Sequence, residues 1–272
     1  MKKYRNASPS IPPIPPDTVR VALDDYGKDN PYVRLGDALE IVVRGLLDET
    51  SLESPSERTT IPNYVYALLT YFQFLEQVTD EQMVDMVRKR ADLRCAVRWH
   101  LGFPNIPPST LCEFRRWLFA NPSYQDTFIT LASRSARLLL PEAPPDLPGI
   151  TDILRSICAV TRVEKLKDQM LLTLESLTAR LPDWVLSIAP PHWYDRYSRS
   201  PKNIFIANAR KDWLALLPEI EQDMKILLDA VAANQDRNLA ETPEIEKLRA
   251  LWEEQFADPQ KRECLLCSHP KP

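Results

Sequence analysis

Apolar residues recur at three- and four-residue steps through most of this chain, which is the spacing of an amphipathic helix. The segment from Pro31 to Asp48 is the first with this pattern. A second begins near Pro62, because proline is favoured in a first helical turn. Its expected polar face holds Asn63, Thr70 and Gln73. Its expected apolar face holds Ile61, Tyr64, Val65, Leu68, Leu69, Phe72 and Leu75.

Start signals divide the region that follows into further helices. Thr79 and Gln82 have the spacing of a capping box, in which each side chain bonds a free backbone N–H of the first turn. This helix is expected to run towards Gly102, a plausible stop. Thr110 and Glu113 repeat the capping-box spacing after two prolines and predict one more helix.

Downstream, the same periodicity predicts a helix after Ser123 and, beyond a proline-rich break at 141–148, three more helices. These three are expected at Val163–Leu181, Asp212–Asn234 and Pro243–Phe256. A short strand is possible near Ile150. The fold class is therefore mainly α.

The same pattern predicts the organisation of the chain. Prolines between Ser8 and Pro16 favour an extended arm over residues 1–30, which either lies solvated over the domain or docks on a partner. A helical domain over 31–140 follows, then the linker 141–148, a second helical portion over 149–257 and a tail over 258–272.

Composition narrows the function classes. Only 5 glycines stand against 25 prolines, and no glycine-rich phosphate loop is present. The net charge of −4 is unlike that of a dedicated nucleic-acid binder, so any DNA contact must come from a local patch. No signal peptide or membrane-length apolar run is visible. With 5 cysteines in no disulfide pattern, we expect a cytoplasmic protein.

Three short sequence motifs in the first half, called words below, resemble the N-terminal domain of a family of bacterial insertion-sequence transposases. They are Ile61-Pro62, Leu-x-x-Ala-x-x-Trp-x-Leu-Gly at Leu93–Gly102, and Ser-Thr-Leu-x-x-Phe-Arg-Arg at Ser109–Arg116. Three more words lie in the second half: Pro-Asp-Trp at Pro182–Trp184, His192–Tyr197 and Leu248–Phe256. The resemblance covers about 61–256, and it implies that the later helices are an insertion in an RNase H-like nuclease domain.

The resemblance implies a DNA-binding function at the ends of an insertion sequence. The expected partners are such DNA ends, with a second copy of the chain or an intact transposase as possible protein partners. An alternative of a different class stays open, namely a helical protein-interaction module, or a transposase relic, with no DNA role.

The resemblance also places a catalytic aspartate at Asp152, because family members carry theirs in a Thr-Asp-Ser-Thr-His segment. Here Thr151-Asp152 is followed by Ile153, Leu154 and Arg155 instead. Phosphodiester cleavage needs several carboxylates to hold its metal ions, and no complete set is visible. We therefore expect a truncated transposase with no cofactor of its own, where Mg²⁺ would require a complete catalytic domain. The alternative role for Asp152 is a helix cap.

Basic residues supply the DNA hypothesis. If the helix after Thr79 is continuous, Arg90, Arg94 and Arg98 form one basic stripe, with Arg115 and Arg116 beside it on the next helix. Such side chains on helices contact DNA phosphates. The competing interpretation is a solvated face of mixed charge, because acidic residues occur in the same segment.

A metal site is not predicted. Cys264, Cys267 and His269 have only part of the spacing of a zinc site, and a closed site needs four ligands. Cys112 or Cys158 would complete it only if the fold brought one of them near. We interpret the three residues as part of the tail.

Overall fold

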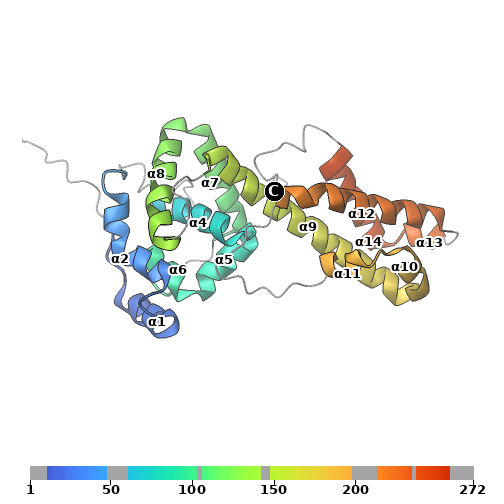
Figure 1. Ribbon diagram of the computed structural model, residues 1–272, viewed down its shortest axis with the longest axis horizontal. Helices are drawn as coiled ribbons and strands as arrows, with labels where there is room; N and C mark the ends of the chain where they lie inside the picture. Colours follow the sequence, from blue (N-terminus) through green and yellow to red (C-terminus); the bar gives the residue numbers. More distant parts are fainter. Residues whose placement is uncertain are drawn as a thin grey trace, which may run out of the picture. The chain divides into compact units, whose positions relative to one another are not determined.

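The computed structural model describes residues 11–47, 61–102, 106–141, 148–197, 213–234 and 237–257. The described residues form helices and no strand, as Figure 1 shows, which confirms the predicted fold class. The suggested strand near Ile150 is wrong. Ile150 is the first residue of α9 (Ile150–Arg180), in which Ile153 and Leu154 are buried at helical spacing.

The chain divides into two compact units, the first up to Leu154 and the second from Arg155. The division falls inside α9, shortly after the predicted linker at 141–148. Residues 142–147 of that linker lie outside the described part of the chain.

The first unit is built from seven helices among its described residues. They are α1 (Pro16–Tyr26), α2 (Pro31–Val43), α4 (Asn63–Glu76), α5 (Asp80–Lys89), α6 (Ala91–Ala96), α7 (Pro108–Ala120) and α8 (Pro122–Leu139). Figure 1 shows α8 beside α2, and the two helices pack against each other. Helix α2 ends at Val43, short of the predicted Asp48, and Gly45 follows it in a turn with φ of +73.

Helix α1 corrects the predicted arm over residues 1–30. Pro16 occupies its first turn, where the missing proline N–H costs nothing, so the helix begins directly after the proline-rich stretch. Thr18 and Ala22 are buried, and the Thr18 hydroxyl donates to the carbonyl of Trp99 at 2.8 Å. Residues 1–10 of the predicted arm lie outside the described residues.

Helix α4 is the centre of the first unit, because all of its residues are buried. It contacts α5, α7 and α8. The expected polar face is therefore wrong: Asn63, Thr70 and Gln73 are buried like the apolar side chains. A helix buried on every side needs internal partners for its polar groups, because an unpaired buried polar group is costly.

The capping box at Thr79 is confirmed. The Thr79 hydroxyl accepts from the N–H of Gln82 at 3.2 Å, and the Gln82 side chain accepts from the Thr79 N–H at 2.9 Å. The second capping box is wrong, because α7 already begins at Pro108 and has no side-chain cap. The helix after Thr79 also breaks at Arg90, and α6 ends at Ala96, before the expected stop at Gly102.

The second unit contains the remainder of α9, followed by α10 (Pro182–Ile188), α11 (His192–Tyr197), α12 (Trp213–Ala233), α13 (Arg237–Ala240), α14 (Pro243–Trp252) and a π-helical turn at Glu253–Ala257. The helices predicted at Asp212–Asn234 and Pro243–Phe256 are confirmed, whereas the one predicted at Val163–Leu181 begins earlier, at Ile150. Trp193 is the largest fully buried side chain among the described residues and lies in the core of this unit. Among the described residues, no helix is long and apolar enough to cross a bilayer.

Helices α2 and α6 approach each other closely at Gly36. A Cβ atom at this position would lie 2.4 Å from the carbonyl oxygen of Cys95. Because that oxygen belongs to the backbone, the two helices would have to move apart to admit a methyl group.

We therefore expect Gly36→Ala to lower the free energy of unfolding by about 1–3 kcal/mol, the usual cost of overpacking. Urea unfolding followed by circular dichroism measures the change. Gly149→Ala is the matched control, because a Cβ there would meet nothing within 4 Å. Equal stability of the two variants would contradict the close approach.

Candidate functional site

Arg115, one of the predicted DNA contacts, is buried inside the first unit. Its side chain comes from α7 and is fully shielded from water. Both terminal nitrogens donate to the carboxylate of Asp80 at 2.8 Å, which makes a bidentate ion pair. Gln73 of α4 accepts from Arg115 at 3.0 Å and donates to Asp80 at 2.7 Å. This network holds α4, α5 and α7 together.

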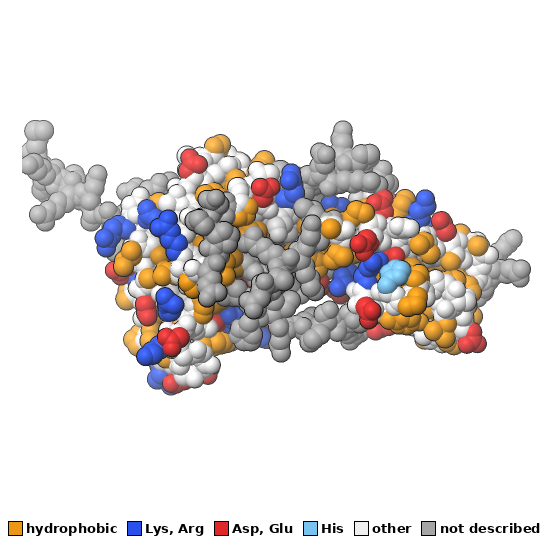
Figure 2. All heavy atoms as spheres, viewed as in Figure 1, with side chains coloured by type: hydrophobic (Ala, Val, Ile, Leu, Met, Phe, Trp, Pro, Cys, Tyr) orange, Lys and Arg blue, Asp and Glu red, His pale blue; other side chains and the backbone are white. Residues whose placement is uncertain are grey.

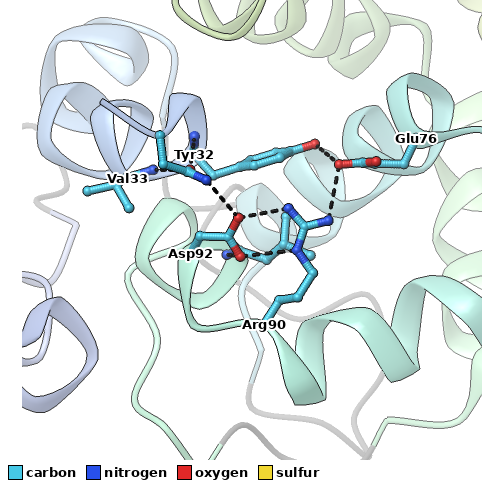
Figure 3. Close-up of polar contacts among 7 residues, drawn as sticks. Tyr32, Val33, Glu76, Arg90 and Asp92 are labelled. Atoms are coloured by element: carbon cyan, nitrogen blue, oxygen red, sulfur yellow. Dashed lines mark hydrogen bonds and ion pairs between the residues drawn. The ribbon is translucent and has the colours of Figure 1, made fainter. Parts of the chain in front are cut away.

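Arg90 is engaged in a second network, which Figure 3 shows. Its guanidinium donates to both carboxylate oxygens of Asp92, at 3.1 and 2.7 Å, and to Glu76 of α4 at 3.3 Å. The hydroxyl of Tyr32 donates to the same Glu76 oxygen at 2.6 Å, and the Arg90 guanidinium lies 5.2 Å from the Tyr32 ring centre. Asn30 donates to Asp92 at 3.3 Å and caps α2.

Burial dominates the electrostatics of this second network. It raises the pKa of Glu76, and the hydrogen bonds from Tyr32 and Arg90 oppose that shift without reversing it. Burial also raises the pKa of Tyr32, and the nearby Glu76 carboxylate raises it further. Burial alone would lower the pKa of Arg90, but its hydrogen bonds and its attraction to Asp92 raise it overall. The guanidinium therefore stays charged.

Arg94 and Arg98 are also buried. Arg94 donates to the carbonyls of Val87 and Arg88 at the end of α5, which gives these terminal carbonyls a partner. Arg98 reaches α2, where it donates to the carbonyl of Gly36 and to the carboxylate of Glu40, each at 3.0 Å.

The expected basic stripe is therefore not formed. It required a continuous helix, and the helix breaks at Arg90, while Arg98 has a left-handed backbone with φ of 56°. The guanidiniums of Arg90, Arg98 and Arg115 point at carboxylates of the same chain. Of the five predicted DNA contacts, Arg116 alone is exposed, on α7.

A different group of arginines lies where α8 meets the end of α2. Arg134 donates to the carbonyls of Val42 and Arg44 at 3.0 and 2.8 Å, which places it at the last turn of α2. Arg44 and Arg137 are exposed. Figure 2 shows basic side chains over α2 and α8. We call Arg44, Arg134 and Arg137 the α2–α8 basic patch.

The sequence analysis did not identify Arg134 and Arg137 as part of a site. A usable signal was present, because α8 has no acidic residue after Asp126. The contribution of Arg44 could not be found in this way, since it depends on the packing of α8 on α2.

Asp152, the catalytic candidate, is exposed in the first turn of α9, where a carboxylate is favoured by the positive end of the helix dipole. Within the described ranges, no group of three or more histidine, cysteine, aspartate or glutamate side chains could hold a metal ion. Cys264, Cys267 and His269 lie outside the described residues, whereas Cys112 and Cys158 are buried.

A further polar cluster links α11 to α12 in the second unit. Asp223, a buried residue, accepts from Arg196 and from the Tyr197 hydroxyl, the latter at 2.7 Å. His192 approaches the same carboxylate at 3.7 Å, and Arg196 also pairs with Glu219. Burial and the Asp223 hydrogen bond raise the pKa of Tyr197, so its hydroxyl remains a donor. This cluster satisfies the buried Asp223 and fixes α11 on α12.

Comparison with known proteins gave no match to a family model, to a curated protein or to a solved structure.

The raised pKa of Glu76 predicts a pH dependence of stability. A carboxyl whose pKa is raised on folding contributes stability below its ordinary pKa, and that contribution is lost as the pH rises through the raised value. Over a pH range that extends upward from the ordinary glutamate pKa of about 4.3, the wild type should therefore lose stability relative to Glu76→Gln.

Urea unfolding of both proteins across this pH range measures the effect. Glu81→Gln, which neutralises an exposed carboxyl in the first turn of α5, is the matched control for the loss of one charge. Parallel stability curves for the wild type and Glu76→Gln would contradict the prediction.

Proposed function

We propose that the chain is a transposase-like protein whose first unit binds DNA, with the ends of an insertion sequence as its target. The resemblance of the sequence to insertion-sequence transposases suggests this function. The observation that carries the proposal in the structure is the uneven distribution of charge over the surface of the first unit.

Among the described residues of this unit, exposed acidic side chains are most concentrated in α1 and the turn after it, and α2 and α8 also expose Asp37, Glu40 and Asp126. Helix α1 and the turn after it carry four exposed aspartates against Arg20 and Lys28: Asp17, Asp24, Asp25 and Asp29. The α2–α8 basic patch carries three arginines, and none of them pairs with a carboxylate of the described residues. A polyanion such as DNA responds to the local electrostatic potential of a surface more than to the net charge of the protein. A chain of net charge −4 can therefore still have a surface that attracts DNA.

The sequence words behind the resemblance support a shared scaffold more than shared chemistry. Leu93, Phe114, Trp193 and Phe256 from these words are buried core residues. Arg115 from the same words forms the ion pair with Asp80. These words specify how the helices pack, and they leave the DNA-contacting side chains to be found on the surface.

The proposal concerns binding and does not include strand cleavage. Asp152 has no set of carboxylates beside it that could hold metal ions, as far as the described residues extend. A protein that occupies the ends of an element without cutting them would compete with an intact transposase for the same DNA. Regulation of transposition is the role that follows from such competition.

A second candidate function is docking of a protein on the second unit. Leu186 of α10 and Tyr194 of α11 expose 64% and 55% of their surface. Figure 2 shows hydrophobic side chains gathered around α10. Exposed apolar surface of this kind is typical of protein interaction sites. This candidate gains weight only if the DNA test below fails.

Binding to duplexes with the terminal repeats of a related insertion sequence tests the proposed function. We expect preferential binding to these repeats over a scrambled duplex of equal length and base composition. Affinity should fall as salt rises, because bound phosphates release counterions, with a slope of log K against log[salt] of about −0.9 for each phosphate bound. Fluorescence anisotropy over a series of salt concentrations gives both quantities.

Absence of binding to either duplex at low salt would overturn the proposal and favour the protein-docking alternative. Equal, salt-dependent binding to both duplexes would retain DNA as the ligand but remove the insertion-sequence ends as a specific target.

A further inference from the structure

We propose that the α2–α8 basic patch contacts the phosphate backbone of duplex DNA, and that the buried arginines of the first unit do not. This inference rests on the proposed function and assigns it a site. It concerns Arg44, Arg134 and Arg137, none of which the resemblance singles out.

Arg134 is held in place before any ligand arrives. One of its terminal nitrogens, Nη1, donates to the carbonyls of Val42 and Arg44, both at the end of α2. The other nitrogens of this guanidinium make no hydrogen bond to the described residues. A planar guanidinium that is fixed along one edge still offers donors to a phosphate, and part of its conformational entropy has already been removed.

Arg44 and Arg137 are the other two members of the patch. Arg44 supplies one of the two carbonyls that Arg134 binds, so its backbone lies directly at the guanidinium. Arg137 follows Arg134 by three residues on α8, a spacing that puts two side chains on the same face of a helix. Arg134 and Arg137 thus share one face of α8, and the backbone of the exposed Arg44 lies beside Arg134.

Several other basic groups of the first unit are less suited to this role. Arg88 and Lys89 are exposed, but both pair with Asp85, at 3.1 and 2.7 Å. Arg20 pairs with Asp17 at 3.6 Å within the aspartate-rich α1. Arg90 and Arg115 would have to abandon buried carboxylates before they could reach DNA, and a carboxylate left buried without its partner costs several kcal/mol. Arg98 is itself buried and donates to the backbone carbonyl of Gly36.

Phosphate contacts position a protein on DNA and carry no direct sequence information. The patch should therefore contribute equally to binding of specific and scrambled duplexes. Any preference for terminal repeats must arise from other residues. This separates the test of the patch from the test of the proposed function.

The test compares Arg44→Gln/Arg137→Gln with the wild type by fluorescence anisotropy on both duplexes. We expect the affinity for each duplex to fall by at least about tenfold, and the salt slope to become shallower by about 0.9 for each phosphate that the variant no longer binds. Arg20→Gln/Lys28→Gln removes the same charge from exposed residues at α1 and should keep both the affinity and the slope close to those of the wild type. Thermal melting establishes that each variant is folded.

Arg134→Lys provides a second test, because lysine keeps the charge but lacks the planar fork. It should weaken binding while leaving the salt slope nearly unchanged. If the Arg44→Gln/Arg137→Gln variant binds DNA as tightly as the wild type, this inference is overturned and the proposed function still stands. Equally weakened binding in that variant and the α1 control would also overturn it, since net charge alone would then explain the effect.

No binding of the wild type to any duplex would instead remove the proposed function, and this inference with it. Vesicles that contain anionic phospholipid test whether the patch binds the phosphate of lipid headgroups in place of DNA. Binding to such vesicles with none to DNA would overturn the assignment of the patch to DNA.

Discussion

The ion pair between Arg115 and Asp80 is the interaction on which the first unit most depends. Both side chains are fully buried, and the removal of two charges from water is costly unless each finds good partners. The pair is bidentate, and Gln73 bonds to both members, so most of this cost is offset. Gln73, Asp80 and Arg115 come from α4, α5 and α7 respectively. Their contacts fix the register of α5 and α7 against the buried α4.

The second network begins on the next turn of the same helix. Gln73 and Glu76 are three residues apart on α4, and Glu76 collects Tyr32 from α2 and Arg90 from the break between α5 and α6. The last turn of α4 thus makes polar contacts to three other helices and to the break between α5 and α6. This arrangement explains why the guanidiniums of Arg90 and Arg115 are unavailable to a ligand, and why we propose the α2–α8 basic patch as the DNA contact instead.

Much of the fold followed from local rules. Helical periodicity placed α2, α4, α12 and α14, and the start of α5 followed from the capping box at Thr79. These features depend on neighbouring residues only. Helix α1 was missed because the prolines before it suggested an extended arm, whereas Pro16 is a favourable first residue of a helix.

The candidate site could not be predicted in the same way. An arginine in the sequence is compatible with a solvated face, a DNA contact or a buried ion pair, and the partner decides among them. Asp80 and Arg115 are 35 residues apart in the sequence, and other partners are separated by more. Helical periodicity therefore carries no information about which residues pair. The break at Arg90 had no proline or glycine to mark it, and it dispersed a stripe that a continuous helix would have formed.

A double-mutant cycle on Arg115 and Asp80 tests the central claim most directly, because it asks whether Arg115 serves the fold. The variants are Arg115→Met, Asp80→Leu and the double variant, and the quantity is the free energy of unfolding in urea. We expect each single variant to be destabilised by about 3–5 kcal/mol. The double variant should be destabilised by less than the sum, with a coupling near the upper end of the usual range of about 0.5–3 kcal/mol. Single effects that add to within about 0.5 kcal/mol would contradict the claim.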